Sequence, residues 1–304
     1  MSAAIKIEKV NYKGWANSWK VSNGEIELVV TGDIGPRIIS IGFVGGQNLF
    51  KNYPEQMGKS GESEWMIRGG SRIWFGPEDA KATYALDNVP VDIRIDGNTL
   101  IATEPVEESV KLVKQMVIRM APSGTSIEVV HRIQNVSLMP TEFAAWILTV
   151  MTPGGVGITG FPPRGTHPEV LPPSNPLVMW AFTDLSDKRW IYTNKYLMLK
   201  MDPAAKAPQK IGHFNKKTWG AYYLNNELFI KRYDADPTKI YPDFGCSYET
   251  FTNSDMLEME TMGPLQKVAP GQWIEHVERW SLHKNVKIGS WTDQELDRVL
   301  LPLL

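Results

Sequence analysis

The chain has 304 residues, of which 42% are hydrophobic and 22% are charged, with a formal net charge of −2. Such a chain can bury a large core, and its composition is that of an ordinary soluble globular protein. The near-neutral charge argues against a nucleic-acid partner, because phosphate binding requires a basic excess, and the single cysteine, Cys246, excludes an internal disulfide.

Short segments of alternating apolar and polar residues run through the first half of the chain. Side chains of a strand point alternately to the two faces of its sheet, so this pattern predicts strands. The turn-forming residues 121–125 predict a hairpin between two of these segments. The predicted strands of this half span residues 25–30, 91–96, 111–120, 126–134 and 143–151.

The second half continues the pattern after a proline-rich region over residues 153–176, which we expect to form a long loop. One helix is predicted over residues 290–301, where Thr292 and Glu295 have the spacing of a capping box. The regular spacing of short strands predicts an all-β sandwich or barrel in a single domain, residues 1–304. The strands predicted here span residues 190–201, 219–224, 228–233, 246–252, 256–261 and 273–282.

The N-terminal residues form no long apolar segment, and no apolar run reaches the length of a membrane span. The use of a single cysteine fits a reducing compartment. We therefore expect a cytoplasmic protein with no membrane partner.

The segment Leu257–Leu265 carries two carboxylates on one strand face. Glu258 and Glu260 project together, while Leu257 and Met259 project to the other side. Like charges on one face repel unless water, a cation or a polar ligand lies near them. The pair therefore indicates either a solvated sheet surface or a carboxylate-lined groove in which a carboxylate accepts a proton.

A second dense segment runs from Ile67 to Asp79. Arg68 and Arg72 supply forked donors, Trp74 supplies a flat apolar face, and Glu78 adds a carboxylate. Sugars present ring C–H patches beside hydroxyl groups, which suits an aromatic platform flanked by charged groups. The alternative is structural, with Trp74 filling the core.

Two further residues are candidates for a site. Among the five histidines, His213 precedes a predicted strand and is our preferred acid. Asp243 lies in a predicted turn, where an aspartate commonly accepts local backbone hydrogen bonds.

Taken together, these segments resemble the galactose mutarotase-like superfamily, which includes the aldose 1-epimerases and hexose-6-phosphate mutarotases. The resemblance rests on three segments: Gly35–Ile41 with its Gly-Pro-Arg-Ile element, Ile67–Gly70 with its Arg-Gly-Gly element, and Leu257–Pro264, which is similar to the Leu-Glu-Thr-Gln strand of the family. It implies a β-supersandwich with the sugar site on a concave sheet face, to which the sequence pattern adds the short C-terminal helix predicted above. It also implies that the general base lies on the last segment, either at Glu260, which we favour, or at Glu258.

The chain departs from the family at the catalytic histidine. In the corresponding segment, Thr141–Thr149, Trp146 stands near the position of that histidine. His213 is then the candidate acid, since the ordinary pKa of an imidazole, about 6.5, suits proton transfer near neutral pH.

The resemblance implies anomer exchange of a sugar by ring opening, with Glu260 and His213 as the catalytic pair. The expected partner is a small carbohydrate, phosphorylated or acidic if Arg68 and Arg72 bind an anion, with Trp74, Glu78, Trp146, Asp243 and Glu258 as further binding residues. No cofactor and no metal is expected. Two alternatives stay open: a noncatalytic carbohydrate-binding protein, and a different carbohydrate-active enzyme such as a polysaccharide lyase.

Overall fold

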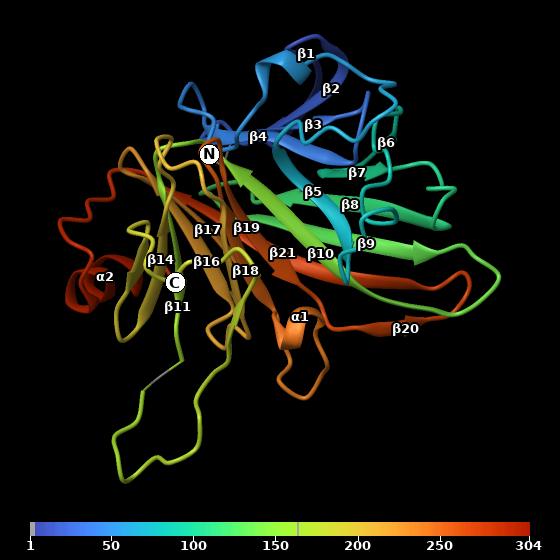
Figure 1. Ribbon diagram of the computed structural model, residues 1–304. Helices are drawn as coiled ribbons and strands as arrows, with labels where there is room; N and C mark the ends of the chain where they lie inside the picture. The colour runs from blue at the N-terminus through green and yellow to red at the C-terminus, as the bar shows by residue number, and fades with distance from the viewer. Residues whose placement is uncertain (1–3, 163) are drawn as a thin grey trace.

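The computed structural model describes residues 4–162 and 164–304, and these form two antiparallel sheets packed face to face (Figure 1). Their inner faces meet in an apolar core, as alternation along the strands requires. Neither described helix is long and apolar enough to cross a membrane. The all-β sandwich predicted from the sequence is confirmed.

The first sheet has eleven strands within the described residues, in the order β1-β2-β3-β4-β5-β10-β19-β18-β15-β12, with β20 also paired to β10. The strand predicted to carry the glutamates, β19, lies in the middle of this sheet between β10 and β18. Its strands are β1 (Lys6–Tyr12), β2 (Trp15–Ser22), β3 (Ile26–Thr31), β4 (Arg37–Phe43), β5 (Gly70–Gly76), β10 (Thr141–Met151), β12 (Leu177–Met179), β15 (Gln209–His213), β18 (Tyr248–Thr252), β19 (Leu257–Met262) and β20 (Gln266–Val268).

The second sheet has ten strands within the described residues, in the order β13-β14-β11-β16-β17-β21-β9-β8-β7-β6. The predicted hairpin is present as β8 and β9. The single strand predicted over residues 190–201 is instead two strands, because the chain turns between Tyr192 and Tyr196. The strands are β6 (Asp92–Asp96), β7 (Thr99–Thr103), β8 (Leu112–Met120), β9 (Ile127–Asn135), β11 (Val156–Gly160), β13 (Trp190–Tyr192), β14 (Tyr196–Lys200), β16 (Trp219–Leu224), β17 (Glu227–Tyr233) and β21 (Trp273–His283).

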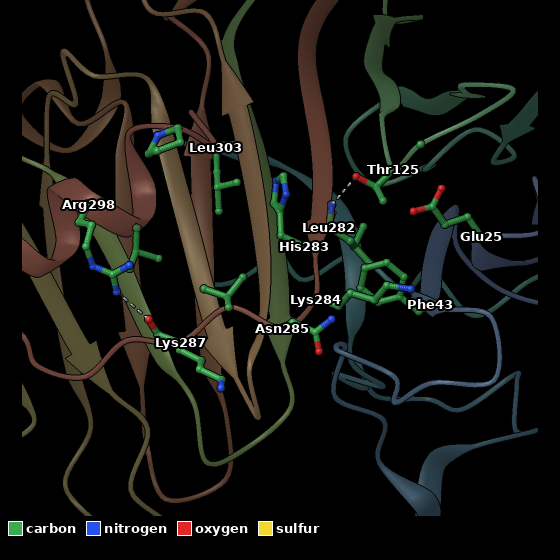
Figure 2. A pocket seen from close by; sticks show the side chains of 14 residues that line it. Glu25, Phe43, Thr125, Leu282, His283, Lys284, Asn285, Lys287, Arg298 and Leu303 are labelled. Atoms are coloured by element: carbon green, nitrogen blue, oxygen red, sulfur yellow. Dashed lines mark hydrogen bonds between the residues drawn. The ribbon is translucent and has the colours of Figure 1, made fainter.

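The predicted C-terminal helix is α2 (Asp293–Leu300), and Thr292 caps it by accepting a hydrogen bond from the backbone N–H of Glu295. Leu296 and Leu300 are buried against the second sheet. A cavity of about 750 Å³ opens between this helix and the end of β21 (Figure 2). Two one-turn elements complete the fold, the 3₁₀ turn η1 (Pro54–Gln56) and α1 (Pro242–Gly245).

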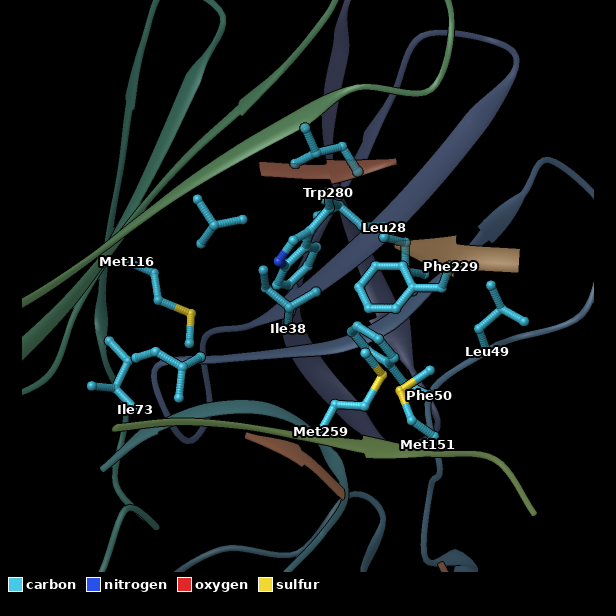
Figure 3. Packing of buried hydrophobic residues seen from close by; sticks show 14 of the residues in the cluster. Leu28, Ile38, Leu49, Phe50, Ile73, Met116, Met151, Phe229, Met259 and Trp280 are labelled. Carbon is cyan, nitrogen blue, oxygen red and sulfur yellow. The ribbon is translucent and has the colours of Figure 1, made fainter. Parts of the chain in front are cut away.

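The main core fills the space between the two sheets (Figure 3). Phe50 and Phe229 meet edge-on at 5.6 Å between ring centroids, and Trp280 packs against both. Met259 of β19 is fully buried in this core. The packing of Met259 fixes the orientation of β19, because its neighbours Glu258 and Glu260 must then point away from the core.

Candidate functional site

The face of the first sheet that points away from the core, here called the outer face, gathers charged and aromatic side chains from five strands. On β19, Glu260 pairs with Leu148 of β10 and with Glu249 of β18. Paired residues of neighbouring strands project to the same side. Trp146 and Lys210 lie on this side too, since Trp146 donates a hydrogen bond to Glu260 and Lys210 contacts Glu249 and Glu260.

A cavity of about 340 Å³ lies over this part of the sheet, and we call it the outer-face cavity. Its walls combine aromatic rings with buried charges, the mixture that small-molecule sites commonly show. Strands β5, β10, β15, β18 and β19 supply part of the lining, and loops supply the rest. The lining residues are Trp65, Ile67, Arg72, Trp74, Glu78, Tyr84, Trp146, Leu148, Trp180, Phe182, Lys210, Phe251, Asn253, Met256 and Glu258.

Arg72 and Glu258 form a buried ion pair on the cavity wall. Arg72 Nη2 lies 3.0 Å from Glu258 Oε1, and both side chains are more than 90% buried. The guanidinium also lies over two tryptophan rings, 4.4 Å from the centroid of Trp74 and 5.3 Å from that of Trp65. These contacts hold the carboxylate of Glu258 in one place beside an aromatic surface.

Lys210 is a second fixed cation of the wall. Its Nζ lies 2.7 Å from Glu249 Oε2 and 3.0 Å from Glu260 Oε2. It also lies over the rings of Trp146 and Trp180, at 4.9 and 4.6 Å from their centroids. Burial lowers the pKa of the Lys210 ammonium, but the two carboxylates raise it by more, so the group stays charged.

Glu260 is fully buried and lies beneath the cavity rather than on its wall. Trp146 Nε1 donates a hydrogen bond of 3.0 Å to its Oε2, and Lys210 donates another of 3.0 Å to the same oxygen. Burial raises the pKa of the Glu260 carboxyl, and Lys210 partly offsets that rise. Trp146 and Lys210 therefore cover this carboxylate where it faces the cavity.

Glu78 and Tyr84 line another part of the cavity. The Tyr84 hydroxyl donates a hydrogen bond of 2.6 Å to Glu78 Oε1. Partial burial raises the pKa of Tyr84, and the hydrogen bond to Glu78 raises it further, so the phenol stays protonated near neutral pH. The pair adds a second carboxylate whose position is fixed by a neighbour.

Five of the nine site residues predicted from the sequence therefore line the outer-face cavity: Arg72, Trp74, Glu78, Trp146 and Glu258. The other four lie elsewhere.

His213 points to the opposite side of the sheet. It pairs with Tyr248, which in turn pairs with Thr261 of the inward-facing side of β19. Its ring packs against Tyr248 and Phe161, at 5.9 Å between centroids in both cases. Burial lowers the pKa of His213 to about 4, so the imidazole is neutral near pH 7. His213 and Glu260 thus face opposite sides of the sheet and do not share a ligand.

Arg68 and Asp243 also lie away from the cavity lining. Arg68 is fully buried, donates a hydrogen bond of 2.5 Å to Glu62, and pairs with Asp87, which also binds Arg37. This arrangement is typical of a structural ion network. Asp243 lies in the one-turn element α1 in the left-handed conformation, with φ of 50°.

Among the site residues that the sequence did not single out, five are charged or aromatic groups used in the description above: Trp65, Tyr84, Trp180, Lys210 and Glu249. For Glu249 a signal was present, because it is the one charged residue of the strand predicted over residues 246–252. Lys210 lies outside every predicted strand, so no pattern marked it. The three aromatic residues lie in loops, where the sequence shows no periodic pattern.

The larger cavity of Figure 2 is a weaker candidate. Its charged side chains, among them Glu25, Lys287 and Arg298, are mostly exposed and do not converge on one point. The described residues also hold no group of three or more His, Cys, Asp or Glu side chains arranged to bind a metal ion.

No protein-family model and no curated protein matches the chain. Solved structures with the same fold do. A galactose mutarotase-like protein from Clostridium acetobutylicum aligns with a TM-score of 0.56 at 8% identity, over 92% of this chain and 99% of that one. A galactose mutarotase-like protein from Lactobacillus casei aligns with a TM-score of 0.54 at 10% identity, over 87% and 99%.

A galactose mutarotase related enzyme from Lactobacillus acidophilus aligns with a TM-score of 0.53 at 11% identity, over 91% of this chain and 98% of that one. Similarity at this level of identity establishes the fold and leaves the activity to the site. The chain therefore has the galactose mutarotase-like β-sandwich fold.

Proposed function

We propose that the chain binds a carbohydrate in the outer-face cavity and exchanges its anomers by opening and reclosing the sugar ring. The observation that carries the proposal is the buried Arg72–Glu258 pair, set on the cavity wall against the rings of Trp65 and Trp74. The rings suit the C–H face of a sugar, and the polar groups suit its hydroxyls.

Glu258 is the proposed base, whereas the resemblance of the sequence favoured Glu260. The reason is access: Glu258 lines the cavity, and Glu260 lies beneath Trp146 and Lys210. Arg72 Nη2, 3.0 Å from Glu258 Oε1, holds this carboxylate at the cavity wall, where it can meet the anomeric hydroxyl of a bound sugar. In this role Glu258 takes the proton of the anomeric hydroxyl as the ring opens, and returns it after the C1–C2 bond has rotated.

The proposed ligand is an uncharged sugar. Both cations of the wall already face carboxylates, Arg72 facing Glu258 and Lys210 facing Glu249 and Glu260. A phosphate would have to separate these pairs and leave buried carboxylates without their partners. Inorganic phosphate should then compete weakly or not at all with the bound sugar.

The test is anomer exchange, measured by NMR on a panel of free aldoses. The protein should accelerate exchange of at least one sugar above its spontaneous rate. Glu258→Gln should lower that rate by roughly 10²- to 10⁴-fold, the usual contribution of a general base. The matched control is Glu128→Gln, at a partly exposed residue of β9 in the other sheet, which should keep the full rate. Equal rates in the Glu258→Gln and wild-type proteins would rule out this base.

A noncatalytic carbohydrate-binding protein is the second candidate. It is favoured by the position of His213, which faces away from the cavity, and by the lack of a histidine among the lining residues in the described part of the chain. Calorimetric binding of a sugar with no anomer exchange above the spontaneous rate would select this function.

A further inference from the structure

Lys210, Glu249 and Glu260 form a compact group that we call the outer cluster. One ammonium lies between two carboxylates, 2.7 Å from Glu249 and 3.0 Å from Glu260. Lys210 lines the cavity, whereas both carboxylates have no exposed surface. The cluster thus connects two buried acids to the cavity through a single basic side chain.

The charges of the outer cluster do not balance. Two ionised carboxylates and one ammonium would leave a net negative charge away from water, and a buried group in that situation takes up a proton instead. Glu260 accepts hydrogen bonds from Trp146 and Lys210. Glu249 has only the Lys210 ammonium, 2.7 Å from its Oε2, as a polar partner, and no second donor among the described residues. Glu249 is therefore the carboxyl that takes the proton.

The groups around Glu249 favour the same result. Glu260 of β19 and Asp243 of α1 repel a negative charge at Glu249, while Lys210 of β15 attracts it. Cys246, which lies just before β18, contributes no charge, because burial raises the pKa of its thiol and keeps the thiol protonated. Arg72 and Glu258 also lie on the outer face, but they form an ion pair with one another rather than with Glu249. Burial raises the pKa of Glu249 well above its ordinary value, and Lys210 offsets only part of that rise.

The fold makes room for the Glu249 side chain. The residue opposite it on β15 is Gly212. A Cβ at that position would lie 3.0 Å from Glu249 Cγ and 2.6 Å from Cys246 Sγ. A glycine there allows Glu249 to lie flat against β15, with its carboxyl next to Lys210.

We propose that Glu249 stores a proton at neutral pH and supplies it through Lys210 to the ring oxygen of the bound sugar. This inference rests on the proposed function. As the bond between C1 and the ring oxygen breaks, its electron pair goes to that oxygen, which takes a proton from the Lys210 ammonium. In the same step the Glu249 carboxyl passes its proton to Lys210, so the lysine never becomes a neutral amine, and Glu258 holds the proton of the anomeric hydroxyl. Reclosure reverses each transfer. Lys210 is the catalytic residue here, and Glu249 acts through it.

Infrared difference spectroscopy tests the stored proton without any sugar. The wild-type protein should show the carbonyl stretch of a protonated carboxyl at neutral pH, and this band should disappear as the pH is raised. Burial also raises the pKa of Glu104 well above its ordinary value, so Glu104→Gln serves as the background for this measurement. In that background the band should disappear when Glu249→Gln is added and remain when Glu258→Gln is added. A band that persists in the protein with both Glu104→Gln and Glu249→Gln, or the absence of a band from the wild type, overturns the proposal. Where Glu249→Gln fails to fold, the wild type alone still overturns the proposal if it shows no such band at neutral pH.

The rate of anomer exchange tests the transfer. Glu249→Gln should lower kcat by about 100-fold or more with little change in KM, as expected when a proton donor is lost. In the wild type the rate should also fall at alkaline pH with the same midpoint as the infrared band. A rate in Glu249→Gln equal to that of the wild type overturns the transfer. If the wild type exchanges no sugar while the band is present, the proposed function and the transfer fail together, but the stored proton stands.

Discussion

Two buried ion clusters made from the same residue types lie on opposite sides of β19. The outer cluster has Lys210 between Glu249 and Glu260. On the inner face, between the sheets, Lys231 pairs with Glu278 at 2.7 Å, and His276 lies 2.9 Å from the Thr261 hydroxyl, which binds Glu278. We call Lys231, Glu278, His131, Thr261 and His276 the inner cluster. All of these side chains are more than 90% buried. Burial therefore does not distinguish the two clusters.

The number of donors distinguishes them. Glu278 accepts hydrogen bonds from Trp280 Nε1 at 2.8 Å and from the Thr261 hydroxyl, and it lies 3.3 Å from His131 Nε2. Burial raises the pKa of Glu278, but Lys231 and the bond with His131 lower it far more, so the carboxyl is ionised.

Glu249 shares one ammonium and has no such donors, and its pKa is raised. The same burial thus gives a stable ion on the inner face and a proton-binding carboxyl on the outer face, the face that has a cavity.

The largest expected effect is the loss of stability in Glu278→Gln. The change leaves the Lys231 ammonium buried without its carboxylate, and breaking a buried pair in this way typically costs about 3–5 kcal/mol. The free energy of unfolding, measured by urea titration at neutral pH, checks the loss. The matched control is Glu249→Gln, which should cost about 1 kcal/mol or less if Glu249 is already neutral. Equal losses in the two variants would contradict the contrast between the clusters.

The second prediction concerns the pH dependence of stability through the inner cluster. Burial lowers the pKa of His276 to about 4, below its ordinary value of 6.5. A lowered pKa in the folded protein means that the unfolded chain binds the proton more readily than the folded protein does. The stability that neutral His276 contributes is therefore present above about pH 6.5 and is lost as the pH falls toward 4, by about 3 kcal/mol. Urea titrations at a series of pH values measure this loss in the free energy of unfolding. His276→Gln should remove the part of the pH dependence that His276 causes.

The outer cluster should show the opposite dependence. The pKa of Glu249 is raised in the folded protein, so its contribution is present below its ordinary value of 4.5 and is lost as the pH rises through the raised pKa. Glu249→Gln should therefore flatten the alkaline side of the stability profile and leave the acidic side unchanged. A variant profile parallel to that of the wild type would show that Glu249 titrates normally.

The smallest expected effect is that of Trp180→Ala. Trp180 is half-buried, and its ring lies over the Lys210 ammonium at 4.6 Å. Its removal takes a ring from the cavity wall and should weaken sugar binding by about 1 kcal/mol, whereas the lost contact with Lys210 should lower the stability by about 0.5–1 kcal/mol. Calorimetry with the sugar found in the exchange screen measures the loss. Tyr192→Ala, which removes a partly exposed ring from the other sheet, should bind that sugar normally.

Much of the fold was predictable because it depends on local pattern. Alternation predicted β3, β8 to β10, β16 to β19 and β21, and the spacing of Thr292 and Glu295 predicted the start of α2. Very short strands such as β12 and β20 gave no signal, since three residues carry no measurable period.

The candidate site was predictable only in part. The alternation of β19 placed Glu258 and Glu260 on the outer face, as the structure does. It did not show that Glu258 lines the cavity while Glu260 lies beneath it, because that difference depends on Trp146 and Lys210 from other strands.

The sequence by itself determined an all-β sandwich, which residues share a face of each predicted strand, and the presence of carboxylates on the face away from the core. These features follow from the alternation of apolar and polar residues along a strand. The tertiary structure decided which carboxylate is accessible, that His213 points to the other side, and that Lys210 joins Glu249 to Glu260. These facts depend on strand order and register, which bring together residues as far apart in the chain as Trp146 and Glu260, 114 positions from one another. No local pattern in the sequence contains that information.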